Sequence, residues 1–342
     1  MGLPPDWRGV IQDTASTATL VSLLTAREVA TGFTSNDTGV PNNLRIYCTS
    51  EAHSSVEKGV GIAGIGRNNI VRIETRGELG MEPELLETAI IADKEANKIP
   101  CAVVLSLGTT STVSIDRIAE IAPICRRHKV WLHVDAAFAG SAAILPEYRW
   151  IVDGIDGADS FVFNPHKWLF TNFDCTAYFV KSPETLVRAF EILPEYLRTS
   201  TLGLVNDYRD WGIQLGRRFR ALKLWFVLRS YGRRGIQERL RHHLSLASYF
   251  VSWVRAQPDL ILMTKPILNF CCFQYKPRDK ERSTDELNAI NMGMINALNA
   301  EGKVYLSHTK VAGQIVFRVV IGQTYVEKAD VDVLIAVLEA VL

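Results

Sequence analysis

Mostly apolar runs alternate with amphipathic segments along the first part of the chain. The apolar runs predict strands buried on both faces, at residues 43–50, 69–74, 100–107, 130–137, 161–163 and 173–180. Between them, apolar residues recur at helical spacing, as at Leu20, Leu23 and Leu24. This spacing predicts helices at 17–27, 52–58, 81–92 and 115–128. Strands and helices in alternation predict an α/β fold with a mainly parallel sheet covered by helices.

The later part of the chain follows a different pattern. An apolar-rich helix is expected at 216–231, and its composition suggests that it crosses between domains. A helix at 235–257, a strand at 270–275, a helix at 283–301, a strand at 314–321 and a closing helix follow. We therefore expect a large α/β domain at 1–222 and a smaller α+β domain at 223–342.

Composition narrows the class of protein. The chain has 342 residues, of which 47% are apolar and 22% charged, as in ordinary globular proteins. The formal net charge of +1 favours neither a nucleic-acid partner nor a membrane surface. The six cysteines form no CxxC pair and no disulfide-like spacing, which predicts reduced core thiols in a cytoplasmic protein and no metal site. We also expect neither a transmembrane segment nor a signal peptide.

Two charged residues stand in unusual places. Lys167 comes shortly after the apolar strand at 161–163 and beside Asn164 and His166. Most lysines keep their ammonium in water, but a desolvated lysine has a lowered pKa, and its neutral amine can attack an aldehyde. Asp135 lies at the end of the preceding strand. An aspartate there could hold a protonated pyridine nitrogen, which lets pyridoxal phosphate act as an electron sink.

Further polar residues gather at the same sheet edge. His53, Thr109, Thr110, Asp135 and Lys167 all follow the carboxyl ends of predicted strands, where open parallel sheets bind ligands. The Thr-Ala-Ser sequence at 14–16 begins a helix, and the amino end of a helix suits a phosphate, although a simple cap is the alternative. Residues 59–64 match GxGxxG, but they lie inside a helical pattern, which disfavours a nicotinamide cofactor.

The chain resembles a known family at these residues. The sequences HVDAAFAGS at 133–141 and NPHKWLFTNFDC at 164–175 are similar to those of group II pyridoxal-phosphate-dependent decarboxylases, especially the aromatic-L-amino-acid decarboxylases. The resemblance extends to GVIQ at 9–12, AHSSV at 52–56, LGTT at 107–110, DYR at 207–209 and LGRRFR at 215–220. It implies a fold-type-I, PLP-dependent transferase-like homodimer. The implied reaction converts an aromatic L-amino acid to its amine and carbon dioxide.

The resemblance also implies roles for individual residues. Lys167 is implied as the Schiff-base lysine, Asp135 as the partner of the pyridine nitrogen, and His53 as the residue that stacks on the cofactor ring. Tyr196 matches the tyrosine of the family's mobile loop, which protonates Cα after decarboxylation. The other implied cofactor contacts are to the phosphate (Ala15, Ser16, Asn164 and His166) and to the ring (Thr110 and Ala137). Gly216 matches the glycine of enzymes with aromatic substrates.

Two departures from the family pattern leave alternatives open. The family's amino-terminal region, which wraps the partner subunit, has no counterpart in this sequence, and Asp13 places an acid beside the implied phosphate site. A truncated or inactive homologue is one alternative. An aldehyde-forming relative is another, although such relatives replace the loop tyrosine or the stacking histidine, and both Tyr196 and His53 are retained here.

Overall fold

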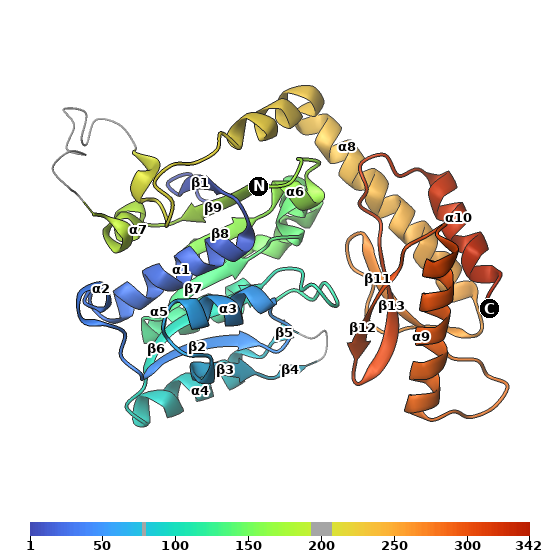
Figure 1. The fold of residues 1–342 in the computed structure, drawn as a ribbon, viewed down its shortest axis with the longest axis horizontal. Helices are drawn as coiled ribbons and strands as arrows, with labels where there is room; N and C mark the ends of the chain where they lie inside the picture. Colours follow the sequence, from blue (N-terminus) through green and yellow to red (C-terminus); the bar gives the residue numbers. More distant parts are fainter. Residues whose placement is uncertain (77–79, 193–206) are drawn as a thin grey trace. The chain divides into compact units, whose positions relative to one another are not determined.

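The computed structural model describes residues 1–76, 80–192 and 207–342 (Figure 1). The chain divides into two compact units, residues 1–109 with 114–232 and residues 110–113 with 233–342. The division falls at Gly232, inside helix α8 (Ala221–Ala256), where φ is 61° and the helix is interrupted. Glycine adopts this backbone conformation at little cost. The expected boundary at residue 222 lies earlier in the same helix.

The first unit is built on a seven-stranded sheet with the order β1-β9-β8-β7-β6-β2-β3. Neighbours are parallel from β8 through β7, β6 and β2 to β3, whereas β9 is antiparallel to both β8 and β1. The predicted mainly parallel sheet is therefore confirmed. The strands are β1 (Arg8–Gln12), β2 (Leu44–Thr49), β3 (Ile70–Ile73), β6 (Ile99–Ser106), β7 (Trp131–Asp135), β8 (Ser160–Phe163) and β9 (Thr176–Val180). A separate short hairpin pairs β4 (Thr75–Arg76) with β5 (Gly80–Met81).

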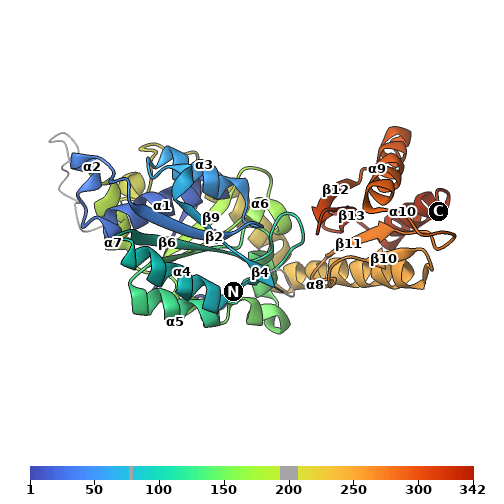
Figure 2. The ribbon, with the colours of Figure 1, turned by 90° about the horizontal axis from the view of Figure 1, so that it is seen from below.

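Helices cover both faces of this sheet (Figure 2). Helix α1 (Ala15–Ala30) lies against one face, with α3 (Ser54–Ile62) and α7 (Pro183–Phe190) beside it, while α4 (Pro83–Glu95) and α5 (Ile118–His128) lie on the other. The strands are apolar on both sides because both sides are covered. Two short helices, α2 (Ser35–Thr38) and α6 (Pro165–Trp168), complete the unit together with 3-10 turns that include η2 (Ala139–Ile144) and η3 (Pro146–Val152).

The second unit packs helices on a four-stranded antiparallel sheet with the order β10-β11-β13-β12. Its core includes Phe250, Phe273 and Phe317, and the rings of Phe273 and Phe317 stack with centroids 4.9 Å apart. Its elements are the later part of α8, β10 (Leu260–Leu262), β11 (Phe270–Tyr275), α9 (Thr284–Glu301), β12 (Ser307–Val311), β13 (Gln314–Val320) and α10 (Lys328–Glu339).

Most expected elements are present with shifted ends. The helix expected from residue 216 begins at Ala221, and that expected from residue 115 begins at Ile118. Strands β1, β10 and β12 and helix α7 were not predicted. These elements are short, and periodicity is weak over so few residues. No helix among the described residues combines the length and the apolar character that crossing a bilayer requires.

The glycines at 59–64 serve helix packing. Gly59 lies within α3, and a Cβ added there would come 2.9 Å from Leu23 Cδ1 in α1. The glycine therefore lets α3 approach α1 closely. A dinucleotide-binding loop instead joins a strand directly to the start of a helix, so this motif is a packing feature and not a nucleotide site.

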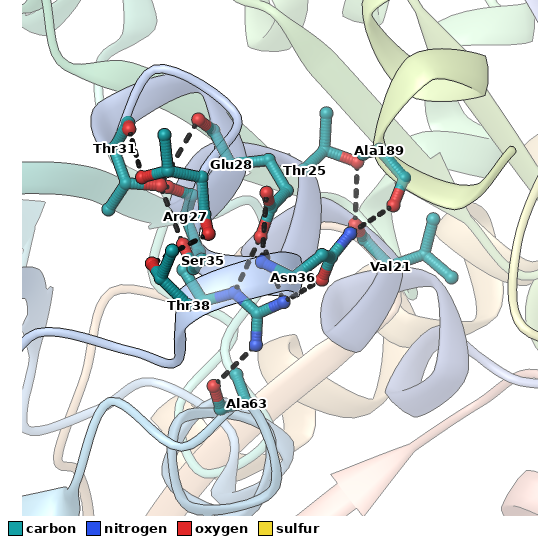
Figure 3. Close-up of polar contacts among 11 residues, drawn as sticks. Val21, Thr25, Arg27, Glu28, Thr31, Ser35, Asn36, Thr38, Ala63 and Ala189 are labelled. Carbon is teal, nitrogen blue, oxygen red and sulfur yellow. Dashed lines mark hydrogen bonds and ion pairs between the residues drawn. The ribbon is translucent and has the colours of Figure 1, made fainter.

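A buried ion pair joins the far end of α1 to its surroundings (Figure 3). Arg27 and Glu28 are 9% and 1% exposed, and Arg27 Nη2 lies 2.9 Å from Glu28 Oε1. Arg27 also donates to the carbonyl oxygen of Ala63, and Asn36 donates through Nδ2 to the carbonyl oxygen of Ala189, both at 2.9 Å. The network thus connects α1, α2, the end of α3 and α7.

Replacing Glu28 by alanine should destabilise the fold strongly. The change leaves the Arg27 guanidinium buried without its carboxylate, and breaking a buried pair in this way costs about 3–5 kcal/mol. Urea unfolding measures the loss. The matched control is Glu57→Ala, which breaks the exposed pair with Arg72 at 2.9 Å and should cost about 0–1 kcal/mol. Equal losses in the two variants would contradict the prediction.

Candidate functional site

Three of the predicted side chains meet at the carboxyl edge of the parallel strands. His53 follows β2, Asp135 is the last residue of β7, and Lys167 follows β8. Electrostatic interaction joins Asp135 to Lys167 and to His53, and each partner influences the pKa of the other. Strands that run parallel end at the same edge, and this places side chains from distant parts of the chain around one space.

Asp135 is the most buried of the three. It is 8% exposed, and its Oδ1 accepts a hydrogen bond from the backbone N–H of Ala137 at 3.0 Å. Within the described part of the chain, no other donor contacts this carboxylate. Burial raises the pKa of Asp135, while the Ala137 N–H, Lys167 and His53 oppose that rise. Oδ2 of Asp135 is therefore free to accept a further hydrogen bond, and a positively charged partner would stabilise the carboxylate.

Lys167 stands in α6, in a turn that begins at Asn164. Burial of its ammonium lowers the pKa of Lys167, and the negative charge of Asp135 acts in the opposite direction. The side chain as a whole nevertheless remains accessible to solvent. Protein atoms therefore surround the amine, while part of the side chain stays in contact with solvent. The expected lowering of the pKa is present, but the amine is not sealed from water.

His53 has a defined tautomer. It is the N-cap of α3, and its Nδ1 accepts a hydrogen bond from the backbone N–H of Ser55 at 3.1 Å. In the neutral ring Nδ1 is therefore the acceptor, and Nε2 carries the proton. Burial lowers the pKa of His53, which favours this neutral form. The exposed ring presents a fixed N–H donor beside Asp135 and Lys167.

The turn that carries Lys167 is held by its neighbours. The Asn164 N–H donates to the Ala137 carbonyl oxygen at 3.1 Å, which ties this turn to the end of β7. The Asn164 Oδ1 lies 2.7 Å from the Thr176 hydroxyl. His166 Nδ1 accepts from the Cys175 N–H at 2.9 Å, so Nε2 carries the proton of this ring as well. Burial lowers the pKa of His166 and keeps the ring neutral.

The amino end of α1 presents backbone donors. Thr14 is the N-cap, and its hydroxyl accepts from the Thr17 N–H at 3.3 Å. The N–H groups of Ala15 and Ser16 have no hydrogen-bond partner among the described residues, and Ser16 is exposed. Free N–H groups at a helix amino end, together with the helix dipole, attract anions.

Three predicted residues fall outside this set. Thr110 belongs to the second unit, where its carbonyl oxygen accepts a hydrogen bond from Arg318 Nη2. Tyr196 lies outside the described residues. Gly216 is exposed and has open space where a side chain would begin. The roles of these three residues remain predictions.

Two side chains that support the site were not predicted from the sequence. Thr176 in β9 hydrogen-bonds Asn164, and Arg220 forms a two-point ion pair with Asp174, with nitrogen-to-oxygen distances of 3.0 and 3.1 Å. Thr176 carried no signal, because a threonine is ordinary in a strand. The arginine-rich segment at 215–220 was noticed, but its acidic partner lies too far away in sequence to be paired with it by inspection.

The buried ring of His133 should make the free energy of unfolding depend on pH. The ring lies in β7 with no exposed surface, Nδ1 is 2.9 Å from the Ser160 hydroxyl, and burial lowers the pKa of His133 to about 3. The unfolded chain takes up this proton near pH 6.5, so the stability that a neutral His133 contributes is full above pH 6.5 and is lost as the pH falls toward 3. The stability gap between the native protein and His133→Gln should shrink by about 2 kcal/mol between pH 7 and pH 5. Urea midpoints at the two values measure this, and a constant gap would exclude the assignment.

Comparison with known proteins identifies the family. The model of the pyridoxal-dependent decarboxylase conserved domain matches residues 3–276. The chain belongs to this decarboxylase family. The resemblance stated from the sequence is thereby confirmed, and so is the expectation of a pyridoxal-dependent enzyme.

Individual members of the family are similar over nearly the whole chain. The aromatic-L-amino-acid decarboxylase of Rattus norvegicus is 42% identical over 332 residues, which cover 95% of this chain and 67% of the relative. The phenylacetaldehyde synthase of Arabidopsis thaliana is 40% identical over 328 residues, covering 94% and 66%. The Oryza sativa TDC solved with PLP and tryptamine superposes with a TM-score of 0.95 at 33% identity and covers 99% of this chain and 72% of that one. The chain thus spans about two thirds of the length of these two curated relatives.

The residues at this sheet edge include the groups that pyridoxal 5'-phosphate requires. Among the described residues, Asp135 has an unpaired acceptor that could hold a protonated ring nitrogen, Lys167 could supply an amine of lowered pKa, and His53 has a neutral ring beside both. The free N–H groups of Ala15 and Ser16 suit the phosphate. The residues present therefore fit the cofactor.

Proposed function

We propose that this decarboxylase removes the carboxyl group of an aromatic L-amino acid, such as tyrosine, DOPA or tryptophan, and releases the amine. The buried carboxylate of Asp135, which has one backbone partner and faces Lys167 and His53, carries the proposal. The identity of 42% to an aromatic-L-amino-acid decarboxylase supports the substrate class. When bound, the cofactor supplies an electron sink for the charge that decarboxylation leaves behind.

Each residue then has a chemical task. Lys167 would hold the cofactor covalently, and its lowered pKa makes the neutral amine more available for that bond. Asp135 would keep the ring nitrogen protonated. His53 would stack its neutral ring on the cofactor and offer its Nε2–H to the substrate carboxylate. Asn164 and His166 with the head of α1 hold the phosphate. To Tyr196 we assign the return of a proton to Cα.

We further propose that the chain works as a cytoplasmic homodimer. Seven large apolar side chains between residues 213 and 228 of the first unit are exposed: Ile213, Leu215, Phe219, Leu222, Trp225, Phe226 and Leu228. Exposed apolar residues this close together in sequence favour protein association. All six cysteines are free and buried, which suits a reducing compartment. Analytical ultracentrifugation of the purified chain tests the assembly.

The decisive experiment locates the cofactor and the product together. The purified protein, loaded with pyridoxal phosphate, is reduced with borohydride and digested, and the peptides are weighed. A pyridoxyl group on the peptide that contains Lys167, with amine released from tyrosine, DOPA or tryptophan, is the expected result. Attachment to other lysines only would overturn the site. Cofactor on Lys167 with no product over hours would favour the inactive homologue.

An aldehyde-forming reaction is the second candidate. The 40% identity to a phenylacetaldehyde synthase supports it. That reaction consumes oxygen and water and releases the aldehyde, ammonia, carbon dioxide and hydrogen peroxide, whereas plain decarboxylation releases only the amine and carbon dioxide. A peroxide assay on the same samples separates the two. Stoichiometric peroxide would replace our first proposal with the second.

A further inference from the structure

An acidic side chain stands at the head of α1, where the phosphate is expected. Asp13 immediately precedes the N-cap Thr14, and its Oδ1 accepts the Thr14 N–H at 2.6 Å. Its Oδ2 lies 3.4 Å from Gln214 Nε2. The carboxylate is therefore held two and three residues before the free N–H groups of Ala15 and Ser16. In the absence of other anions it is the negative charge that benefits from the positive end of the helix.

The same carboxylate has a poorly paired cation nearby. Arg217 donates through Nη1 to the Ile11 carbonyl oxygen at 3.5 Å, while its Nε and Nη2 are buried and have no hydrogen-bond partner among the residues that the structure describes. Burial and the like charge of Arg220 lower the pKa of Arg217, and the charge of Asp13 opposes them. A buried guanidinium with so few acceptors depends on nearby negative charge for compensation. Asp13 supplies it.

We propose that the negative charge of Asp13 compensates Arg217 while the phosphate site is empty. When the cofactor's phosphate is bound, the same charge weakens its binding. The inference rests on the proposed function, because it concerns the phosphate of that cofactor. It assigns Asp13 as a residue that sets cofactor affinity without touching the reacting atoms.

The charges explain the direction of the effect. A phosphate monoester carries about −1.5 to −2 at neutral pH. Close to α1 it meets the cation Arg217, but it also meets the fixed carboxylate of Asp13, and like charges at short range repel. Removing the charge of Asp13 removes this repulsion and leaves Arg217 free to favour the phosphate. In the cofactor-free protein, however, the same change leaves Arg217 without the negative charge that compensates it.

The test is the affinity of Asp13→Asn for two forms of the cofactor. Asparagine keeps the shape and the acceptor for the Thr14 N–H but removes the charge. We expect pyridoxal phosphate to bind about tenfold more tightly than to the native chain, while pyridoxal, which lacks the phosphate, binds equally well. Titrations followed by visible absorbance measure both. The matched control is Asp153→Asn, an exposed aspartate at the end of η3, which should change neither affinity.

Thermal unfolding of the cofactor-free protein provides the second readout. Asp13→Asn should melt at a lower temperature than the native chain, because Arg217 loses its counter-charge, and added pyridoxal phosphate should reverse the order. Arg217→Gln should act oppositely on binding and weaken pyridoxal phosphate but not pyridoxal. Equal affinities of Asp13→Asn and the native chain for pyridoxal phosphate would overturn the inference alone. An equal gain for pyridoxal would overturn it too. Failure of every protein to bind pyridoxal phosphate would overturn the proposed function as well.

Discussion

Replacement of Lys167 by alanine is expected to abolish decarboxylation, with a loss of about 10³-fold or more in kcat. In the proposed site the amine of Lys167 would be the nucleophile that joins the cofactor to the protein, and burial lowers the pKa of Lys167 at the edge of the sheet where Asp135 and His53 also lie. No other lysine interacts with Asp135 in the described part of the chain. A second lysine therefore cannot take its place without a rearrangement of the strand ends.

The measurement separates chemistry from folding. The Lys167→Ala protein should remain folded, because the side chain is accessible and no hydrogen bond of its amine supports the scaffold within the described residues. Its visible absorbance should show no lysine-bound cofactor, and borohydride should fix none at this position. The control is Lys181→Ala, which removes a surface lysine that donates to the Asp156 carbonyl oxygen at 2.9 Å. Retained turnover in Lys167→Ala would refute the site assignment.

Replacement of Asp135 by asparagine should have the second largest effect, a loss of roughly 10³-fold in kcat, by analogy with other buried aspartates that fix a protonation state. The amide can still accept the Ala137 N–H, so the turn after β7 should keep its shape. It carries no charge, however, and cannot hold a proton on the ring nitrogen. Cofactor affinity should fall with activity, while the free energy of unfolding should change little or rise, because burial opposes the charged carboxylate.

A second aspartate provides the matched control. Asp159 precedes β8, and its Oδ2 accepts the Leu132 N–H at 2.7 Å. Burial raises the pKa of Asp159, as it does that of Asp135. It belongs to the opposite, amino edge of the same strands. Asp159→Asn should therefore leave turnover and cofactor affinity unchanged, and equal losses in the two variants would show that Asp135 acts only on folding.

The sequence by itself determined the alternation of most strands and helices in the first unit, although not β1, α7 or the exact ends of the elements. Apolar runs between helical segments specify strands covered on both faces. Once the strands are parallel, His53, Asp135 and Lys167 must share one edge. The motifs around Asp135 and Lys167 also pointed to the family that the comparison confirmed. The alternation of elements and the family motifs depend on local patterns, which can be read from a single sequence.

Only the tertiary structure decided which distant residues support that edge. The antiparallel pairing of β1 with β9 places Gln12 opposite Thr176 and so brings Asp13 and the head of α1 beside the turn that contains Asn164. Neither partner of this pairing shows a pattern that selects the other, because strand pairing depends on packing of the whole sheet. The under-paired guanidinium of Arg217 is likewise visible only when burial is known. The sequence shows which residues are charged, but only the folded structure shows which of these charges are removed from water.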